Sequence, residues 1–136
     1  MSFVRLAKPE DHAAIARFDE WHHVTPELIA AGRCLVAGRE SQIEAFATTS
    51  YWFGTKPFVD VVFVAGAARR NGLGSALLSE IESMYTGKRL WITTELQNMP
   101  MQKLLHRRGY ELCGVIEKLA KIPELVYSQE LGRTRS

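Results

Sequence analysis

The sequence predicts a mixed α/β fold of the α+β class, in which a single, mostly antiparallel sheet of about seven strands is flanked by about four helices. Three observations support this prediction. The 136 residues suit one core, so a single domain over residues 1–136 is expected. Strand-like β-branched segments alternate with segments whose apolar residues recur at helical spacing. Glycine and proline separate these segments.

The N-terminal part is predicted to contain a strand and two helices. Residues 3–7, FVRLA, are typical of a short strand. A helix is expected over residues 8–21, because Pro9 suits a first helical turn and apolar residues then share one face. A second, compact helix is expected over residues 25–32, with Thr25 as its N-terminal cap.

The central part is predicted to contain three strands followed by a helix. Residues 34–52 indicate two strands joined by a polar turn at residues 40–42. Residues 59–64, VDVVFV, form a nearly continuous β-branched run that is typical of a strand covered on both faces. Apolar residues at helical spacing begin at Leu73, and Gly87 provides the stop.

The C-terminal part is predicted to contain a strand, a short helix and two more strands. The strand covers residues 88–96, and the helix covers residues 98–109 and ends at a glycine. The last two strands are expected at residues 110–119 and 124–131. The predicted order is therefore β-α-α-β-β-β-α-β-α-β-β.

Composition and charge narrow the classes of function. The net charge of +2 gives no indication of nucleic-acid binding. No apolar stretch is long enough to span a membrane or resembles a signal peptide, so a cytoplasmic protein without membrane association is expected. Cys34 and Cys113 lie in apolar surroundings and are expected to be buried thiols, and no metal-ligand spacing is found.

The stretch AARRNGLGSALL, residues 67–78, places two glycines at the start of a predicted helix. A helix N-terminus that follows a glycine turn favours the binding of a phosphate group. A Walker loop is excluded because no Lys-Ser or Lys-Thr follows a glycine, and a dinucleotide fingerprint is excluded because Leu77 occupies the third glycine position. A glycine turn that merely links a strand to a helix remains the alternative.

Two segments together resemble the GNAT family of N-acetyltransferases. VFVAGAARRNGLGSALL resembles the acyl-CoA loop of that family, and NMPMQKLLHRRGY resembles its second motif. The order of helices and strands agrees along nearly the whole chain. The matching positions are Arg69, Gly72 and Gly74 in the first segment and Asn98, Leu104, Gly109 and Tyr110 in the second.

The resemblance implies acetyl-CoA as co-substrate, and no metal. In this family the pantetheine arm bonds to the backbone of the fourth strand, and the pyrophosphate lies on the following loop. The residues implied are Val62, Phe63 and Val64 for pantetheine, Arg69, Arg70, Asn71, Gly72, Leu73, Gly74 and Ser75 for the pyrophosphate, and Asn98, Met101, Leu104 and Leu105 for the opposite wall.

Asp60 is the candidate catalytic base, because family members often carry a carboxylate on this strand. Strand alternation predicts that it faces the same side as Val62 and Val64. The alternative is a strand-end aspartate that is exposed to solvent or holds a loop. Many members carry a tyrosine as acid where this chain has Leu105, which leaves water, His106 or no acid as alternatives. The remaining carboxylates considered as base are Glu95 and Glu117.

The resemblance implies transfer of acetyl from acetyl-CoA to a primary amine of a small molecule or peptide. The alternative is a non-catalytic acyl-CoA sensor with the same fold. Trp21, Tyr51 and Trp52 are candidate substrate contacts, since aromatic faces suit cations, although such residues also fill cores. The acceptor is not identified, and formation of a homodimer is left open.

Overall fold

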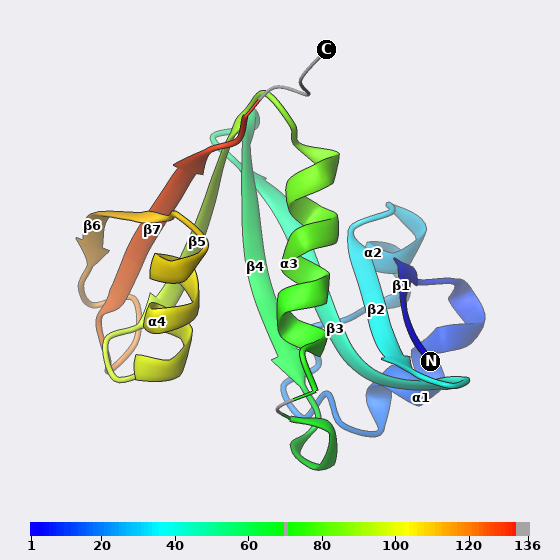
Figure 1. Cartoon of the computed structure of the whole chain (residues 1–136). Helices are drawn as coiled ribbons and strands as arrows, with labels where there is room; N and C mark the ends of the chain where they lie inside the picture. Colours follow the sequence, from blue (N-terminus) through cyan, green and yellow to red (C-terminus); the bar gives the residue numbers. More distant parts are fainter. Residues whose placement is uncertain (70, 133–136) are drawn as a thin grey trace. The chain divides into compact units, whose positions relative to one another are not determined.

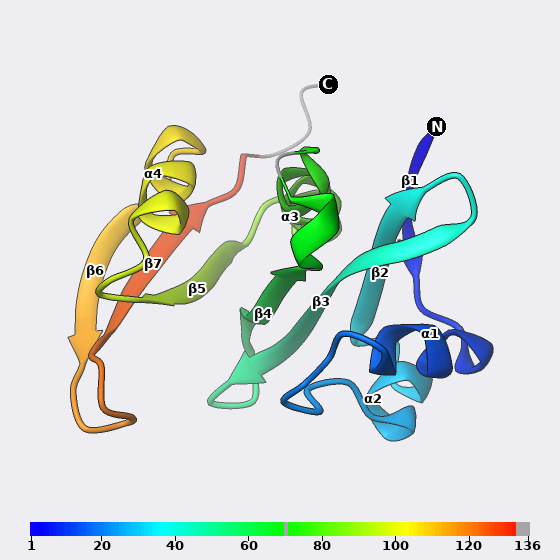
Figure 2. The ribbon, with the colours of Figure 1, turned by 90° about the horizontal axis from the view of Figure 1, so that it is seen from below.

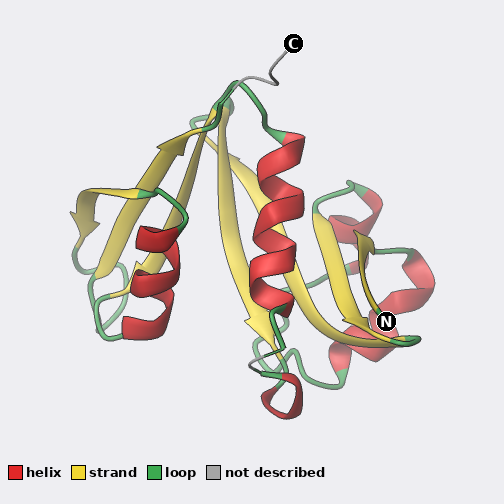
Figure 3. Cartoon of the chain, in the orientation of Figure 1, coloured by secondary structure: helices red, strands yellow, loops and turns green. Residues whose placement is uncertain are grey.

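A computed structural model describes residues 1–69 and 71–132 of the chain. The described residues have the predicted order of helices and strands (Figures 1 and 3). The strands are β1 (Ser2–Leu6), β2 (Cys34–Arg39), β3 (Gln42–Trp52), β4 (Lys56–Val64), β5 (Arg89–Glu95), β6 (Glu111–Ile116) and β7 (Glu124–Glu130). The helices are α1 (His12–Ala16), α2 (Pro26–Ala30), α3 (Leu73–Met84) and α4 (Met99–Arg107), and 3-10 turns cover Pro9–Asp11 and Gly66–Ala68.

The seven described strands form one mixed sheet in the order β1-β2-β3-β4-β5-β7-β6. The pairs β1–β2, β2–β3, β5–β7 and β6–β7 are antiparallel. The β4–β5 pair is parallel, and its register joins Phe58 to Trp91 and Val59 to Ile92. The predicted fold class, a mixed and mostly antiparallel sheet with four helices, is therefore confirmed.

The chain divides into two compact units. The first comprises Met1–Ser50 and Asp60–Met84, and the second comprises Tyr51–Val59 and the chain from Tyr85 onward. The expectation of a single domain over residues 1–136 stays a prediction. No helix in the described ranges is long and apolar enough to cross a membrane.

The first unit packs helices on both faces of its strands. In Figure 2, α1 and α2 lie on one face of β2 and β3, and α3 lies on the other. The α1–α2 face has a buried core made of Ile15, Val24, Ile29, Cys34, Val36 and Phe46, with Val61 and Phe63 of β4 packed against it. The opposite face is filled by Leu73, Leu77, Leu78 and Ile81 of α3.

The first helix is shorter than predicted. Instead of a helix over residues 8–21, a 3-10 turn leads into α1, which ends at Ala16. The cause is Asp19, whose buried carboxylate accepts hydrogen bonds from the backbone N–H groups of His23 (3.0 Å) and Val24 (2.8 Å). This local side-chain bonding competes with continuation of the helix.

Two burial predictions are wrong. Val59 is fully buried, but Asp60–Val64 are half-buried, so the second half of β4 is not covered on both faces. Cys34 is buried as expected, whereas Cys113 is exposed on β6. The terminal position of β6 in the strand order, with β7 as its neighbour, explains this exposure.

In the second unit, α4 lies beside the strands β5, β7 and β6 (Figures 1 and 2). The predicted cap of α4 is confirmed, because the side-chain oxygen of Asn98 accepts a hydrogen bond from the Met101 N–H at 3.1 Å. The helix ends near Gly109, whose φ of +91° suits glycine. Leu105 and Tyr110 are buried in this unit.

Candidate active site

The glycine turn between β4 and α3 has the geometry that an anion-binding helix start requires. After Val64 the chain forms the 3-10 turn Gly66–Ala68, and the Asn71 side-chain amide donates to the Ala68 carbonyl at 2.9 Å. Gly72 then adopts a φ of +74°, and α3 begins at Leu73. The left-handed glycine lets the chain turn sharply, so the first N–H groups of α3 follow directly after a tight bend.

The first turn of α3 rests on the end of β4. A Cβ atom placed on Gly74 would lie 3.7 Å from methyl carbons of both Val62 and Val64. The Arg69 side-chain Nε donates to the Val64 carbonyl at 3.3 Å. The fold thus brings together residues from both the predicted pantetheine strand and the predicted pyrophosphate loop.

The other residues of the predicted pyrophosphate loop differ in their exposure to solvent. Leu73 is buried in the α3 core, and Ser75 is half-buried. Asn71 is exposed and is tied to the turn by the hydrogen bond described above. Arg70 lies outside the described residues.

Asp60 is a half-buried carboxylate with two polar partners. The Ser50 hydroxyl donates to its Oδ1 at 2.7 Å, and the Arg33 guanidinium lies 3.8 Å from its Oδ2. Desolvation by burial raises the pKa of Asp60, and the Ser50 hydrogen bond and the charges of Arg33 and His23 oppose that rise. A carboxylate whose pKa is raised in this way is better suited to accept a proton than an exposed one.

The side chain of Asp60 lies on the α1–α2 face of the sheet. Its partner Ser50 follows Phe46 by four positions on β3, which places both side chains on one face. Phe63 stacks against Phe46 at a ring separation of 5.7 Å, so Asp60 and Phe63 share this face although three positions separate them. Strict alternation is therefore interrupted within β4. The prediction that Asp60 faces the same side as the two valines that approach α3 is wrong.

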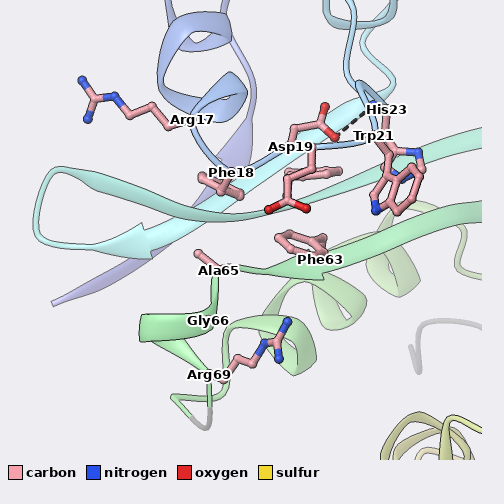
Figure 4. A pocket seen from close by; sticks show the side chains of 11 residues that line it. Arg17, Phe18, Asp19, Trp21, His23, Phe63, Ala65, Gly66 and Arg69 are labelled. Carbon is pink, nitrogen blue, oxygen red and sulfur yellow. Dashed lines mark hydrogen bonds between the residues drawn. The ribbon is translucent and has the colours of Figure 1, made fainter.

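The first unit contains a cavity of about 350 Å³ between the segment after α1 and the end of β4 (Figure 4). Its aromatic lining consists of Phe18, Trp21, Phe46 and Phe63, together with the imidazole of His23. Its charged lining consists of Arg17, Asp19, Glu20 and Arg69. The cavity therefore joins Trp21, a predicted substrate contact, to Phe63 and Arg69, which are predicted cofactor contacts.

Stacked phenylalanines form the apolar part of this cavity. The rings of Phe18 and Phe63 are 6.0 Å apart and nearly parallel, with an interplanar angle of 14°. The ring of His23 lies 6.4 Å from that of Phe46. Trp21 is 78 % exposed, so a large indole face at the cavity is open to a ligand.

Sequence reasoning missed Asp19, Glu20 and His23 as members of a cavity. The sequence predicts a helix that ends at Trp21, and helical spacing gives no reason for Asp19, Glu20 and His23 to face one cavity. A signal was present in the run DEWHH, residues 19–23, because five polar or aromatic residues in succession have no helical apolar face. The buried Asp19 carboxylate fixes the backbone of this run, as the dashed line in Figure 4 shows for His23.

The remaining predicted site residues belong to the second unit. Met101 and Leu104 are half-buried on α4, and Leu105 is fully buried. The Tyr51 hydroxyl donates to the Tyr85 hydroxyl at 3.5 Å, and Trp52 stacks on Phe58 with ring centres 4.2 Å apart. The roles of Tyr51 and Trp52 in substrate binding stay predictions.

A sequence profile of the acetyltransferase (GNAT) family matches residues 3–110. The chain therefore belongs to this family of acyl-CoA-dependent transferases. No curated protein sequence matches the chain significantly.

Solved structures share the fold over almost the whole chain. An acetyltransferase of the GNAT family from Bacillus cereus has a TM-score of 0.82 and 24 % identity, over 98 % of this chain and 99 % of that chain. The yncA protein of Salmonella typhimurium, solved with its cofactor acetyl-CoA, has a TM-score of 0.76 and 20 % identity over 99 % and 96 %. Arabidopsis thaliana Naa50, in complex with the bisubstrate analogue CoA-Ac-MVNAL, has a TM-score of 0.78 and 14 % identity over 94 % and 97 %.

Proposed function

We propose that the protein is an acetyl-CoA-dependent N-acetyltransferase, which transfers the acetyl group directly to a primary amine of a small molecule or peptide. The main support for this proposal is that the first turn of α3 packs on the end of β4 in a chain of the GNAT family. The acetyl-CoA bound to yncA and the CoA–peptide conjugate bound to Naa50 support the same donor and an amine acceptor.

The residues at the glycine turn fit a CoA thioester. The bend at Gly72 leaves the first N–H groups of α3 open to the approach of phosphate oxygens. The guanidinium of Arg69, which lies beside this turn, supplies a positive charge. The backbone of Val62–Val64 would hold the pantetheine arm by strand-like hydrogen bonds. When bound, the co-substrate supplies an activated acetyl group.

The chain's own part in the reaction is to position the amine and to take up its proton. The aromatic and charged cavity of the first unit offers an amine a place beside Phe63, in the middle of the predicted pantetheine strand. Asp60 is the carboxylate that promotes removal of this proton, either as the direct acceptor or through an intervening group. No protein nucleophile is needed for direct transfer.

Isothermal titration calorimetry with two Gly74 variants tests the donor site. The Gly74→Ala methyl group would make ordinary contacts with Val62 and Val64, so acetyl-CoA affinity should stay within about threefold of wild type. Gly74→Asp places a carboxylate in the first turn of α3, where it suits the helix dipole but repels a pyrophosphate. Because the added side chain starts beside the methyl groups of Val62 and Val64, circular dichroism must first show that the variant is folded. The folded variant should lose at least about tenfold in affinity, a change of about 1.4 kcal/mol. Equal affinities of the two variants would contradict the assignment.

A thiol-release screen over polyamines, amino acids, aminoglycosides and peptides tests the reaction. Release of CoA with at least one amine is expected. Binding of acetyl-CoA without release for any amine would favour the second candidate, an acyl-CoA sensor. The buried Leu105, in place of the tyrosine acid of many family members, is the observation that favours that candidate.

A further inference from the structure

The wall of the cavity in the first unit contains a base, His23, to which the family pattern assigns no role. Of the described residues, the cavity wall includes His23 but not Asp60. His23 follows α1 in sequence, whereas Asp60 belongs to β4 on the same face of the sheet. An amine seated in the cavity would therefore meet the imidazole before it met the carboxylate.

The position of His23 is fixed by its backbone rather than by its ring. Its N–H donates to the Asp19 carboxylate at 3.0 Å, and the neighbouring Val24 N–H donates to the other oxygen at 2.8 Å. Asp19 is only 4 % exposed, so this double hydrogen bond is well shielded from water. The imidazole is thus available for proton transfer in the cavity, while hydrogen bonds to Asp19 fix the backbone at His23 and Val24.

Asp60 lies on the same face of the sheet as Phe46, whose ring is 6.4 Å from the His23 ring. The His23 charge acts on the Asp60 carboxylate strongly enough to be among the influences on its pKa. Oδ1 of Asp60 is held by the Ser50 hydroxyl at 2.7 Å, and Arg33 lies 3.8 Å from Oδ2. Asp60 is therefore fixed in orientation and can stabilise a positive charge that develops on His23.

We propose that His23 is the group that takes the proton from the acceptor amine, and that the negative charge of Asp60, on the same face of the sheet, favours the protonated imidazole. Imidazole is the side chain that most often transfers protons in enzymes near neutral pH. The acidic groups that share the cavity wall with His23 are Asp19 and Glu20, and the basic groups are Arg17 and Arg69. Asp60, with Arg33 beside it, lies outside this wall.

The proton balance of this step is complete. The acceptor ammonium gives one proton to a nitrogen of His23 and becomes a neutral amine. The amine nitrogen forms a bond to the acetyl carbonyl carbon, and the bond between that carbon and sulfur breaks. The second proton of the nitrogen neutralises the departing thiolate through solvent, and His23 returns its proton to water. This inference rests on the proposed function.

Matched histidine variants test the proposal. His23→Asn and His22→Asn alter neighbouring exposed histidines, of which only His23 is in the cavity wall. Asparagine tolerates the φ of +53° at His22, so neither change should unfold the chain. We expect His23→Asn to lower the rate of thiol release about 100-fold with unchanged acetyl-CoA affinity, and His22→Asn to stay within about twofold of wild type.

Chemical rescue separates a proton-transfer role from packing. Added imidazole should raise the rate of His23→Ala at least about tenfold, because it can enter the space left by the ring. More than a third of wild-type activity in His23→Asn, an equal loss in His22→Asn, or no rescue by imidazole would each overturn the proposal. Failure of the proposed function differs, because wild type itself would then release no thiol with any amine, and this inference would fall with it.

Discussion

The combined effect of its surroundings disfavours the negative charge of Asp60. Burial raises its pKa more than Ser50, Arg33 and His23 together lower it. The folded state therefore binds the proton more tightly than the unfolded chain does, so the charged form weakens the fold at neutral pH. A charge kept at a cost in stability is typical of a functional site.

Replacement of Asp60 by asparagine should separate activity from stability. Asp60→Asn keeps the shape and removes the charge, so thiol release should fall at least about tenfold while the melting temperature at pH 7 rises. The dependence of the rate on pH should also shift in the variant, because removal of the Asp60 charge changes the electrostatic field at His23. Steady-state rates and thermal unfolding across pH provide the measurements.

One result would contradict this role for Asp60, and another would contradict the predicted gain in stability. A rate loss below about threefold, which corresponds to less than about 1 kcal/mol in the barrier, would eliminate it as a participant in proton transfer. A lower melting temperature in Asp60→Asn would show that its hydrogen bond with Ser50 outweighs its desolvation. Ser50→Ala provides the matched comparison, since it removes only the hydroxyl donor.

At the residue scale, the sequence was informative about residue type and less so about direction. Asp60 stands out as the one acidic residue in the run VDVVFV, and this contrast requires no structure. Its direction was misjudged, because alternation holds only in a regular strand and is interrupted between Asp60 and Phe63. His23 was missed because its position depends on a hydrogen bond to Asp19 that the pattern of apolar residues does not report.

At the scale of elements, the β2–β3 hairpin contains a glycine that has no room for a side chain. The register shifts between Ala37 and Gly38, as in a bulge. A Cβ atom on Gly38 would coincide with the Gln42 carbonyl oxygen and lie 3.1 Å from the Phe3 ring. The backbone oxygen cannot move without a change in the pairing of the two strands.

Gly38→Ala should therefore destabilise the protein by about 2–3 kcal/mol, as expected for overpacking in a close-packed region. Urea unfolding monitored by circular dichroism measures this loss. Gly66→Ala is the control, because no atom lies within 4 Å of the added carbon and its φ is not positive. The control should change stability by less than about 0.5 kcal/mol. Similar losses in the two variants would show that the close approach at Gly38 is easily relieved.

Caps and turns were predictable where they depend on neighbouring residues. Thr25 and Asn98 both accept hydrogen bonds from the first turns of their helices, as their residue types indicate. The length of α1 was not predictable in this way. Its end is set by the Asp19 side chain, which bonds to backbone groups four and five positions onward. A longer first helix and one that ends at Ala16 differ little in local propensity, so packing decides between them.

At the scale of the whole molecule, two buried or half-buried aspartates give stability opposite dependences on pH. Asp11 accepts hydrogen bonds from both terminal nitrogens of Arg5, at 2.7 and 3.2 Å, and from the Lys8 N–H at 2.7 Å. The hydrogen bond from Arg5 is the main cause that lowers the pKa of Asp11. Asp11 therefore stabilises the fold above its ordinary pKa, and this contribution is lost as the pH falls through its folded-state pKa. Asp60 has the opposite sign, because acid relieves its penalty.

Asp11→Asn should isolate the contribution of Asp11. At pH 7 it breaks a charge-assisted pair around a side chain that is 9 % exposed, so the free energy of unfolding should fall by about 1.5–3 kcal/mol. Below about pH 4 wild type loses the same contribution, and the difference between the two proteins should shrink. Urea titrations from pH 7 to pH 3 follow this difference, with Glu10→Gln, an exposed neighbour, as control. A difference that stays constant with pH would mean that Asp11 stabilises the fold by shape and hydrogen bonding and not by its charge.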